Sequence, residues 1–175
     1  MKTKTVLLVG LVTLIAALAY AAPKAAKTAK PAVDAAAAFD RLKSLAGEWE
    51  ATSAQGKAHI SIELIANGTA LVEKEVAEGM QPMLTVYTVD GNRLLLTHYC
   101  MAGNQPRMQA QSFDPASGEI DFAFLDAGNL TSPAAGHMHN VHVRVVDNDH
   151  LVSTWEFYEN GKKKFGEAFQ YSRVK

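Results

Sequence analysis

The sequence predicts an all-β protein built as a single antiparallel up-and-down barrel of about ten strands. Three observations support this prediction. From residue 48 onward, apolar and polar residues alternate with a period of two in short runs. Tight-turn sequences separate most of these runs, so neighbouring runs are expected to pair as antiparallel hairpins. Each run has one apolar side. A sheet made of many such strands can bury all of its apolar sides by closing into a barrel.

The first 21 residues have the pattern of a secretion signal. Lys2 and Lys4 precede an apolar run over residues 6–19, and residues 19–21 read Ala-Tyr-Ala, with small residues at the two positions that a signal peptidase reads. A retained anchor would need about 20 apolar residues to span a bilayer, which is more than this run provides. We therefore expect cleavage after Ala21, no stable membrane insertion of the product, and a periplasmic or secreted location.

Composition separates a linker from one barrel domain. Residues 22–36 are rich in Ala, Lys and Pro and have too few large apolar residues to pack, so we expect a disordered linker before a domain at 37–175. Cleavage leaves 15 basic and 18 acidic residues, a net charge of −3, and the cations are scattered, which argues against nucleic-acid binding. Cys100 is the single cysteine, so stability has to come from the core without an intramolecular disulfide.

A short helix is predicted between the linker and the first strand. Asp34 opens it, Phe39, Leu42 and Leu45 recur at helical spacing, and Gly47 ends it. We expect this helix to close one end of the barrel.

The ten predicted strands follow in order. They cover residues 48–54, 57–66, 69–78, 82–90, 92–101, 106–114, 118–125, 136–147, 149–158 and 162–173. Two-residue hairpin turns are predicted where the chain offers residues that tolerate positive φ, at Asn67-Gly68, Asp90-Gly91 and Asn160-Gly161. The one long connection, residues 126–136, is predicted to form a flap over the mouth of the barrel.

Two histidines on one predicted strand are the most informative polar residues. His137 and His139 share a strand face with Val141, Val143 and Val145, so both imidazoles should point inward. Two imidazoles at this spacing can share a metal ion, and burial would keep them neutral and able to ligate. The spacing specifies no third ligand, so a role as polar lining or loop capping is the alternative.

A second group of reactive residue types is Thr97-His98-Tyr99-Cys100. A thiol beside a histidine can be a nucleophile, but residues two apart on a strand lie about 7 Å apart, which is too far for direct proton transfer. We therefore expect His98, Tyr99 and Cys100 to contact a ligand or to fill the structure, and not to catalyse.

Arg107 and the two tryptophans complete the candidate residues. Arg107 lies on the polar face of the predicted sixth strand, which favours a solvated outer position. The alternative register would place this cation inside the barrel, where it could bind a ligand carboxylate. Trp49 is predicted to plug the closed end, and Trp155 to line the core.

Several stretches carry a resemblance to known barrels. Gly47-Glu48-Trp49 after a short helix resembles the calycin superfamily of lipocalins and fatty-acid-binding proteins. Most of the chain, from about residue 39 to 173, resembles a family of exported bacterial proteins with a lipocalin-like domain and no assigned reaction. The stretches that carry this second resemblance are His98-Tyr99-Cys100, Gly103-Asn104-Gln105-Pro106-Arg107-Met108, Gly136-His137-Met138, and Trp155-Glu156 before Asn160-Gly161.

The ten strands and interior histidines are also similar to nitrobindin, a haem-binding barrel. Nitrobindins open with a longer G-x-W-x-G-x-G sequence, whereas this chain reads Trp49-Glu50-Ala51-Thr52. No axial histidine can therefore be assigned by position.

These observations favour an exported barrel that holds a small, mostly apolar molecule in its interior, with a few polar contacts near the mouth. The candidate ligand-binding residues are His98, Tyr99, Cys100, Arg107, His137, His139 and Trp155. One alternative is a metal- or haem-binding barrel, enzymatic or not, that uses His137 and His139. Another is a packed structural or stress protein without a ligand. The sequence assigns no catalytic residue, cofactor or oligomeric state, and it favours binding over catalysis.

Overall fold

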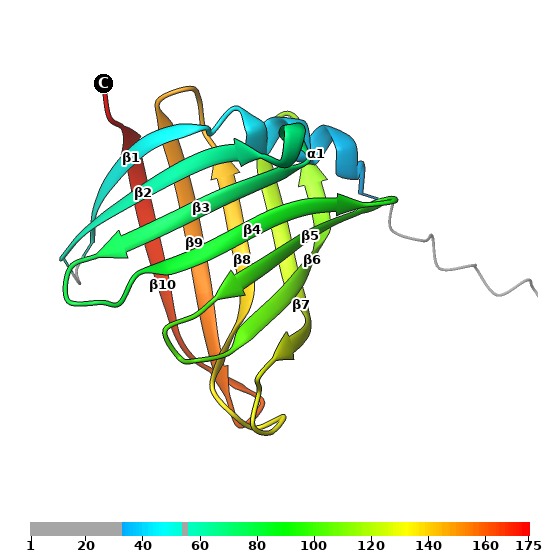
Figure 1. Ribbon diagram of the computed structural model, residues 1–175, viewed down its shortest axis with the longest axis vertical. Coiled ribbons are helices and arrows are strands. Elements are labelled where there is room, and N and C mark those ends of the chain that lie inside the picture. Colours follow the sequence, from blue (N-terminus) through cyan, green and yellow to red (C-terminus); the bar gives the residue numbers. More distant parts are fainter. Residues whose placement is uncertain (1–32, 54–55) are drawn as a thin grey trace, which may run out of the picture. The chain divides into compact units, whose positions relative to one another are not determined.

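The protein is a closed antiparallel up-and-down barrel with a short N-terminal helix (Figure 1). The computed structural model describes residues 33–53 and 56–175. Each strand pairs with its neighbours in sequence, and the first strand pairs with the tenth to close the sheet. The predicted fold class is confirmed. The predicted signal sequence, residues 1–21, and the predicted linker as far as residue 32 lie outside the described residues.

The elements agree closely with those predicted, and strand ends differ by at most three residues. They are α1 (Ala35–Lys43), β1 (Gly47–Ser53), β2 (Gly56–Ile65), the 3₁₀ turn η1 (Ala66–Gly68), β3 (Ala70–Ala77), β4 (Met83–Asp90), β5 (Arg93–Tyr99), β6 (Gln105–Asp114), β7 (Glu119–Gly128), β8 (His137–Val145), β9 (His150–Glu159) and β10 (Lys162–Arg173).

The predicted two-residue hairpin turns are confirmed in part. Asn160 and Gly161 have φ of 53° and 68° between the paired residues Glu159 and Lys162, which is the predicted two-residue turn. The prediction at Asn67-Gly68 was wrong in length, because β2 and β3 are joined by the longer turn containing η1. The Thr69 hydroxyl donates to the Ala66 carbonyl at 2.7 Å and holds that turn closed.

α1 lies across one end of the barrel, as predicted (Figure 1). Its Asp34 cap accepts a hydrogen bond from the Ala37 N–H at 3.0 Å, and its apolar face, with Phe39 and Leu42, is buried. Trp49 beneath it is fully buried, and its indole N–H donates to the Leu45 carbonyl at 2.8 Å. The tryptophan therefore plugs this end, which we call the helix end.

Arg173 explains why a glycine precedes that tryptophan by two residues. Its guanidinium lies 4.1 Å from the Trp49 ring and donates to the Ala46 and Ser44 carbonyls at 2.8 and 2.9 Å. Gly47 has φ of +134°, and a Cβ there would lie 2.6 Å from Arg173 Nη1. The positive φ therefore favours glycine here, and a larger residue would also displace the arginine side chain.

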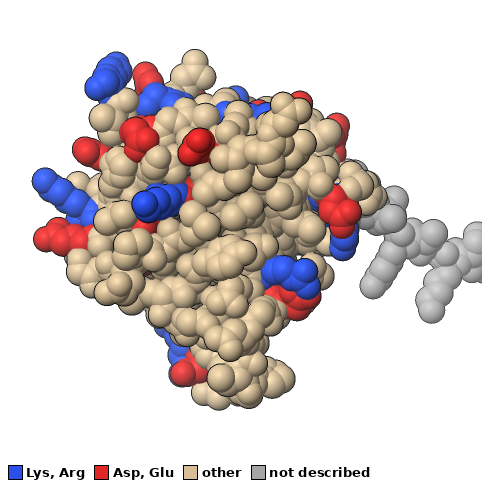
Figure 2. All heavy atoms as spheres, viewed as in Figure 1, with Lys and Arg blue, Asp and Glu red and all other residues tan. Residues whose placement is uncertain are grey.

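The outer surface carries both signs of charge. On the face shown in Figure 2, basic and acidic side chains lie near one another across the barrel wall. Within residues 33–53 and 56–175, no helix is both long and apolar enough to cross a membrane.

Candidate functional site

The end opposite α1, which we call the open end, contains a gap between two strands. β7 and β8 pair from Glu119↔Arg144 only as far as Ala123↔Asn140. Beyond that point β7 continues along β6 to Gly128, and β8 starts beside β9 at His137. Register irregularities lie on both sides of the gap, in the β6–β7 and β8–β9 pairings. The diverging strands leave a wedge-shaped opening in the wall.

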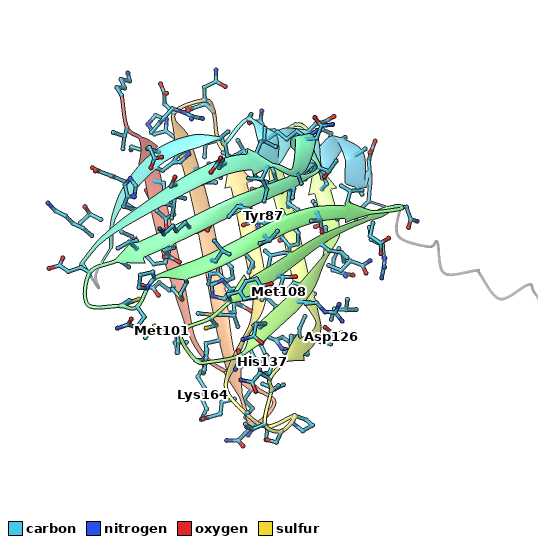
Figure 3. The ribbon with its side chains drawn as sticks, in the orientation of Figure 1. Tyr87, Met101, Met108, Asp126, His137 and Lys164 are labelled. Atoms are coloured by element: carbon cyan, nitrogen blue, oxygen red, sulfur yellow. The ribbon has the colours of Figure 1, made fainter. Side chains whose placement is uncertain are left out.

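A pocket of about 460 Å³ fills this opening, and we call it the mouth pocket. Strand β7 forms one side, β8 and β9 form the other, and the connection after β7 covers it. Its lining residues are Phe124, Leu125, Asp126, Ala127, Leu130, Ser132, Pro133, His137, His139, Tyr158 and Gly161. Figure 3 shows His137 and Asp126 at this end, away from α1.

The covering connection, residues 129–136, is tied to its surroundings. Asn104 and Asn129 donate side-chain hydrogen bonds that join it to the β5–β6 turn, at 2.9 and 2.6 Å. The Asn160 N–H donates to the Ala134 carbonyl at 2.8 Å. Gly136 is needed for close packing, because a Cβ there would lie 2.5 Å from the Phe157 ring. The predicted flap is therefore present as a connection that these hydrogen bonds hold in place. It is shorter than predicted because β7 extends to Gly128.

The two histidines predicted to share a face meet in this pocket. His137 Nε2 and His139 Nδ1 are 3.0 Å apart, and His137 Nδ1 is 2.8 Å from the Ala135 carbonyl oxygen. A carbonyl only accepts, so His137 Nδ1 carries the proton and its Nε2 accepts from His139 Nδ1. This assignment leaves His139 Nε2 as a bare acceptor.

Aromatic rings hold His139 on both sides. Its ring stacks on Tyr158, with centroids 4.2 Å apart, and on Phe124, with centroids 4.9 Å apart. Burial lowers the pKa of His139, the nearby His137 lowers it further, and Glu156 acts in the opposite direction. The imidazole is therefore neutral at pH 7 and is oriented as a hydrogen-bond acceptor.

The histidine pair alone does not complete a metal site. In the part of the chain that the structure describes, no cluster of three or more His, Cys, Asp and Glu side chains is arranged to hold a metal ion. A metal on His137 and His139 would have to break their mutual hydrogen bond and take its other ligands from water or from a bound molecule.

A second polar group lies inside the barrel, and it begins on β3. Glu73 and Glu75 pair in register with Ile62 and Ile60 of β2, whose side chains are buried, so both carboxyls face the interior. Glu75 is 8% exposed, whereas its neighbour Val76 is 45% exposed. This strand therefore turns its acids inward and a valine outward.

Strands β4, β5, β9 and β10 add further side chains to this interior polar group. Thr85 of β4 pairs with both Glu73 and His98 of β5, and its hydroxyl lies 3.0 Å from His98 Nδ1. The His98 ring contacts the Trp155 ring across the barrel, with centroids 4.6 Å apart, and Glu167 pairs in register with Trp155. We call this set the interior polar ring. It comprises Glu73, Glu75, Thr85, His98, Trp155 and Glu167.

Burial shifts the pKa values of the ionisable side chains in the interior polar ring. It raises the pKa of Glu73 to about 7, with a further rise from Glu75, although the hydrogen bond that Tyr87 donates to Glu73 at 3.0 Å lowers it. Burial and the charge of Glu167 raise the pKa of Glu75 to about 7, and burial also raises that of Glu167. Burial lowers the pKa of His98 to about 4. At neutral pH the ring thus holds a neutral imidazole and partly protonated carboxyls.

The remaining predicted residues, Tyr99, Cys100 and Arg107, are not among the residues that make up either group. Tyr99 is 48% exposed, and Arg107 lies on the outer face in an ion pair with Asp126, as its strand pattern favoured. Cys100 is a half-buried free thiol that accepts from the Ala102 N–H at 3.5 Å. Burial raises the pKa of Cys100, and His98 is bonded to Thr85 instead, so the thiol lacks the activation a nucleophile needs.

The sequence reasoning did not select the three interior glutamates or the rings around His139. Glu73 and Glu75 alternate with Val72 and Val76, so the pattern of that strand alone favours the opposite face. Glu167 alternates in step with Phe165, Phe169 and Tyr171, which indicates a shared strand face but no role for the carboxyl. Strand pairing could have identified these glutamates as interior residues, because each of them is paired with a buried residue on the neighbouring strand.

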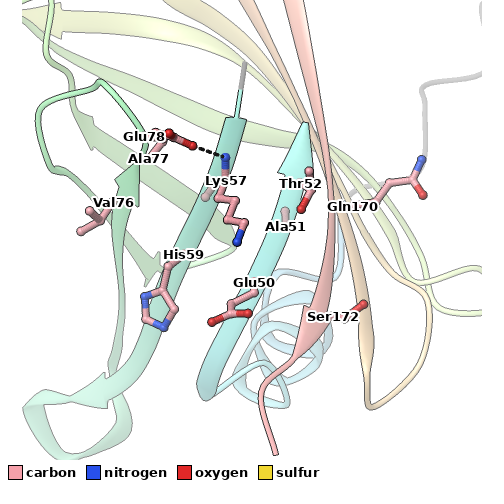
Figure 4. A pocket seen from close by; sticks show the side chains of 11 residues that line it. Glu50, Ala51, Thr52, Lys57, His59, Val76, Ala77, Glu78, Gln170 and Ser172 are labelled. Atoms are coloured by element: carbon pink, nitrogen blue, oxygen red, sulfur yellow. Dashed lines mark hydrogen bonds between the residues drawn. The ribbon is translucent and has the colours of Figure 1, made fainter. Parts of the chain in front are cut away.

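A third hollow lies on the outer wall formed by β1, β2, β3 and β10 (Figure 4). It measures about 660 Å³, and Lys57 and Glu78 face each other at its edge, with the Lys57 N–H 3.4 Å from Glu78 Oε2. Its lining includes Glu50, Thr52 and His59 but no Phe, Tyr or Trp. It therefore lacks the apolar enclosure that a small-molecule site normally has.

Comparison of the sequence with models of protein families found no match, and comparison with curated proteins found no matching relative. The closed barrel is consistent with a lipocalin-like fold. The closer resemblance to exported bacterial proteins stays a prediction.

Proposed function

We propose that this protein is a small-molecule-binding barrel whose mouth pocket takes a mostly apolar ligand that carries a hydrogen-bond donor. The observation that carries the proposal is His139, which is held between Phe124 and Tyr158 and has a bare Nε2. The pocket volume of about 460 Å³ lies within the range of about 300–1,000 Å³ that is usual for small ligands.

The lining defines the ligand further. Leu125, Leu130 and Pro133 add apolar surface to the two aromatic rings, which suits a flat hydrocarbon or aromatic body. The one acid of the pocket, Asp126, is paired with Arg107, so its charge is compensated at the rim. A hydroxyl or amide N–H on the ligand would donate to His139 Nε2.

The experiment compares 1-naphthol with naphthalene, which has the same body without the donor. We expect 1-naphthol to bind at least about tenfold more tightly by calorimetry, because it alone satisfies the imidazole. His139→Phe should abolish this preference while it retains the stacking. His150→Ala is the matched control, because His150 is the exposed first residue of β9 and pairs with Asp147. Equal binding of the two probes, or an unchanged preference in His139→Phe, would refute the proposal.

We also propose that the protein is exported and works in the periplasm or outside the cell. The support is the charged, apolar and small-residue pattern of residues 1–21. The mass of the protein isolated from its native compartment should correspond to a chain that begins at Ala22. Native mass spectrometry of the same sample would identify a co-purifying ligand. A retained N-terminus would contradict export but would leave the binding proposal standing.

Metal binding by the same histidine pair is the second candidate function. The observation that favours it is the 3.0 Å separation of two imidazole nitrogens. Dialysis against Zn²⁺ followed by metal analysis separates the two candidates. Stoichiometric zinc that is lost in His137→Ala would replace the first proposal, whereas substoichiometric zinc would favour the first.

A further inference from the structure

A further hollow lies on the outer face of β6, β7, β8 and β9, and we call it the outer polar hollow. It measures about 330 Å³, and its lining on β7 and β8 includes Asp121, Ala123, Asn140 and His142. Ala123 pairs in register with Asn140, Asp121 pairs with His142, and the residue between them on each strand is buried in the core. The four side chains therefore face outward, and the small side chain of Ala123 leaves space between its longer neighbours.

Polar side chains of β6 and β9 border this hollow on its two sides. The β6–β7 register shifts here, which leaves Gln111 as an extra residue of β6 that lines the hollow. Glu156 and Thr154 of β9 line the opposite side, where they pair with Asn140 and His142. Bulges redirect side chains and are frequent beside binding and active sites. The outer polar hollow thus collects polar groups from four consecutive strands.

His142 is held in one orientation at the hollow. Its Nδ1 lies 2.7 Å from Asp121 Oδ1, and the Ser112 hydroxyl donates to the other oxygen of the same carboxylate. A carboxylate only accepts, so the neutral imidazole carries its proton on Nδ1 and leaves Nε2 as a bare acceptor. An acid that fixes the tautomer of a histidine in this way prepares the other ring nitrogen to bind.

The two amide side chains of the hollow also offer acceptors. Asn140 donates to Glu156 Oε2 at 2.8 Å, and Gln111 donates to the Gln109 carbonyl at 3.2 Å, so both amide oxygens keep lone pairs for a ligand. Glu156 is bonded through both of its oxygens, since its Oε1 accepts from Lys163 at 2.6 Å. The acids are therefore used within the protein, and the acceptors left for a ligand are neutral.

This set of acceptors selects a neutral molecule with several hydroxyl groups. An anion would find no Lys or Arg among the described residues that line the hollow. An organic cation would have to compete with Lys163 for Glu156 and with His142 for Asp121. The volume of about 330 Å³ lies near the lower end of the range of about 300–1,000 Å³ for small ligands, which fits one ring and not a long chain.

We propose that the outer polar hollow is a second binding site, which takes a single sugar ring. Hydroxyl groups of the sugar donate to His142 Nε2 and to the amide oxygens of Asn140 and Gln111, and a C–H face of the ring lies over Ala123. The hollow shares no described lining residue with the mouth pocket, so this site does not depend on the function proposed above.

The experiment is an NMR titration of the protein with methyl β-D-glucopyranoside and methyl β-D-galactopyranoside. Cyclohexanol, a six-membered ring with one hydroxyl, is the reference ligand. At least one glycoside should bind with a dissociation constant of about 10 mM or lower, and at least about tenfold more tightly than cyclohexanol. Its binding should shift the ring resonances of His142 and the side-chain amide resonances of Asn140.

Two variants locate the bound sugar, and two controls test other places. Ala123→Leu fills the hollow and should weaken glycoside binding by at least about tenfold. His142→Phe keeps a ring without the acceptor and should weaken it by about fivefold or more. His150→Ala is the matched control, because His150 is also paired with an acid, Asp147, but does not line the hollow. His139→Phe changes the mouth pocket, and neither control should alter glycoside binding.

Circular dichroism verifies that each variant is folded. The proposal is overturned if neither glycoside binds at about 50 mM, or if cyclohexanol binds as tightly as the glycosides. Unchanged glycoside binding in Ala123→Leu or in His142→Phe would also overturn it, as would an equal loss of binding in His150→Ala.

Discussion

The two ends of the barrel are built from different chemistry. At the helix end, Trp49 and Leu42 are fully buried among apolar residues, and Arg173 bonds to the backbone around them. The open end contains the mouth pocket and the interior polar ring. Among the described residues, buried side-chain polar atoms without partners also concentrate there, at His98, Asn104 and Glu167, and Arg41 is the exception at the helix end. The helix end thus stabilises the fold, and the open end is suited to binding.

The largest expected effect tests the stabilising role of the helix end. Trp49→Ala removes a fully buried ring and the surface on which Arg173 packs, so it should reduce the free energy of unfolding by about 3–5 kcal/mol. His139→Ala at the open end should cost less than about 1 kcal/mol. Urea denaturation followed by circular dichroism measures both. Equal costs would contradict a division of roles between the ends.

Glu75→Gln should stabilise the protein at high pH. The pKa of Glu75 is raised from 4.5 to about 7 in the folded state, so the folded protein holds more protons than the unfolded chain between these values. Its stabilising contribution is complete below about pH 4.5 and is lost as the pH rises through about 7. Glutamine is always neutral, so the variant should gain about 1–3 kcal/mol at pH 8 and almost nothing at pH 4. Thermal unfolding at both pH values measures this, and a variant that is less stable at pH 8 would show that Glu75 is not buried.

His98 should respond to pH in the opposite direction. Burial lowers its folded-state pKa from 6.5 to about 4, so its contribution is complete above about pH 6.5 and is lost as the pH falls through about 4. The ring carbon protons of His98 should therefore keep the chemical shifts of a neutral imidazole from pH 8 down to about pH 5. Histidine NMR spectra recorded over this range would detect protonation. A midpoint near the ordinary value of 6.5 would mean that the ring is open to water.

The smallest expected effect tests the direction in which β3 faces. Val76→Thr changes an exposed outer side chain and should alter the free energy of unfolding by less than about 0.5 kcal/mol. Leu71→Thr, on the inner face of the same strand, should cost several times more because Leu71 is fully buried. Chemical denaturation of the two variants gives the comparison. A larger cost for Val76→Thr would mean that the strand is turned the other way.

Local pattern was sufficient for most of the architecture. Alternation and hairpin residues such as Asn160 and Gly161 set the order of the strands, and the G-x-W sequence located the plug. His137 and His139 could also be assigned to one face, because three valines follow them at the same period. Each of these features depends on residues close together in sequence.

The remaining parts of the site depend on contacts between distant segments. The acids of β3 face inward because Glu75 pairs beside Ile60, although both faces of that strand contain apolar and charged residues. The mouth pocket exists because β7 and β8 separate after Ala123, and alternation within one strand contains no information about where its neighbour departs. Strand pairing therefore decides which polar residues become part of a site.

The most direct test of this account is a carbon-13 NMR titration of the glutamate carboxyls. The account predicts that Glu73 and Glu75 titrate as an interacting pair with apparent pKa values near 7, because both lie inside the open end of the barrel. Titration of both carboxyls near the ordinary value of 4.5 would place them in water. That result would contradict the inward-facing β3 and the polar interior on which the division between the two ends depends.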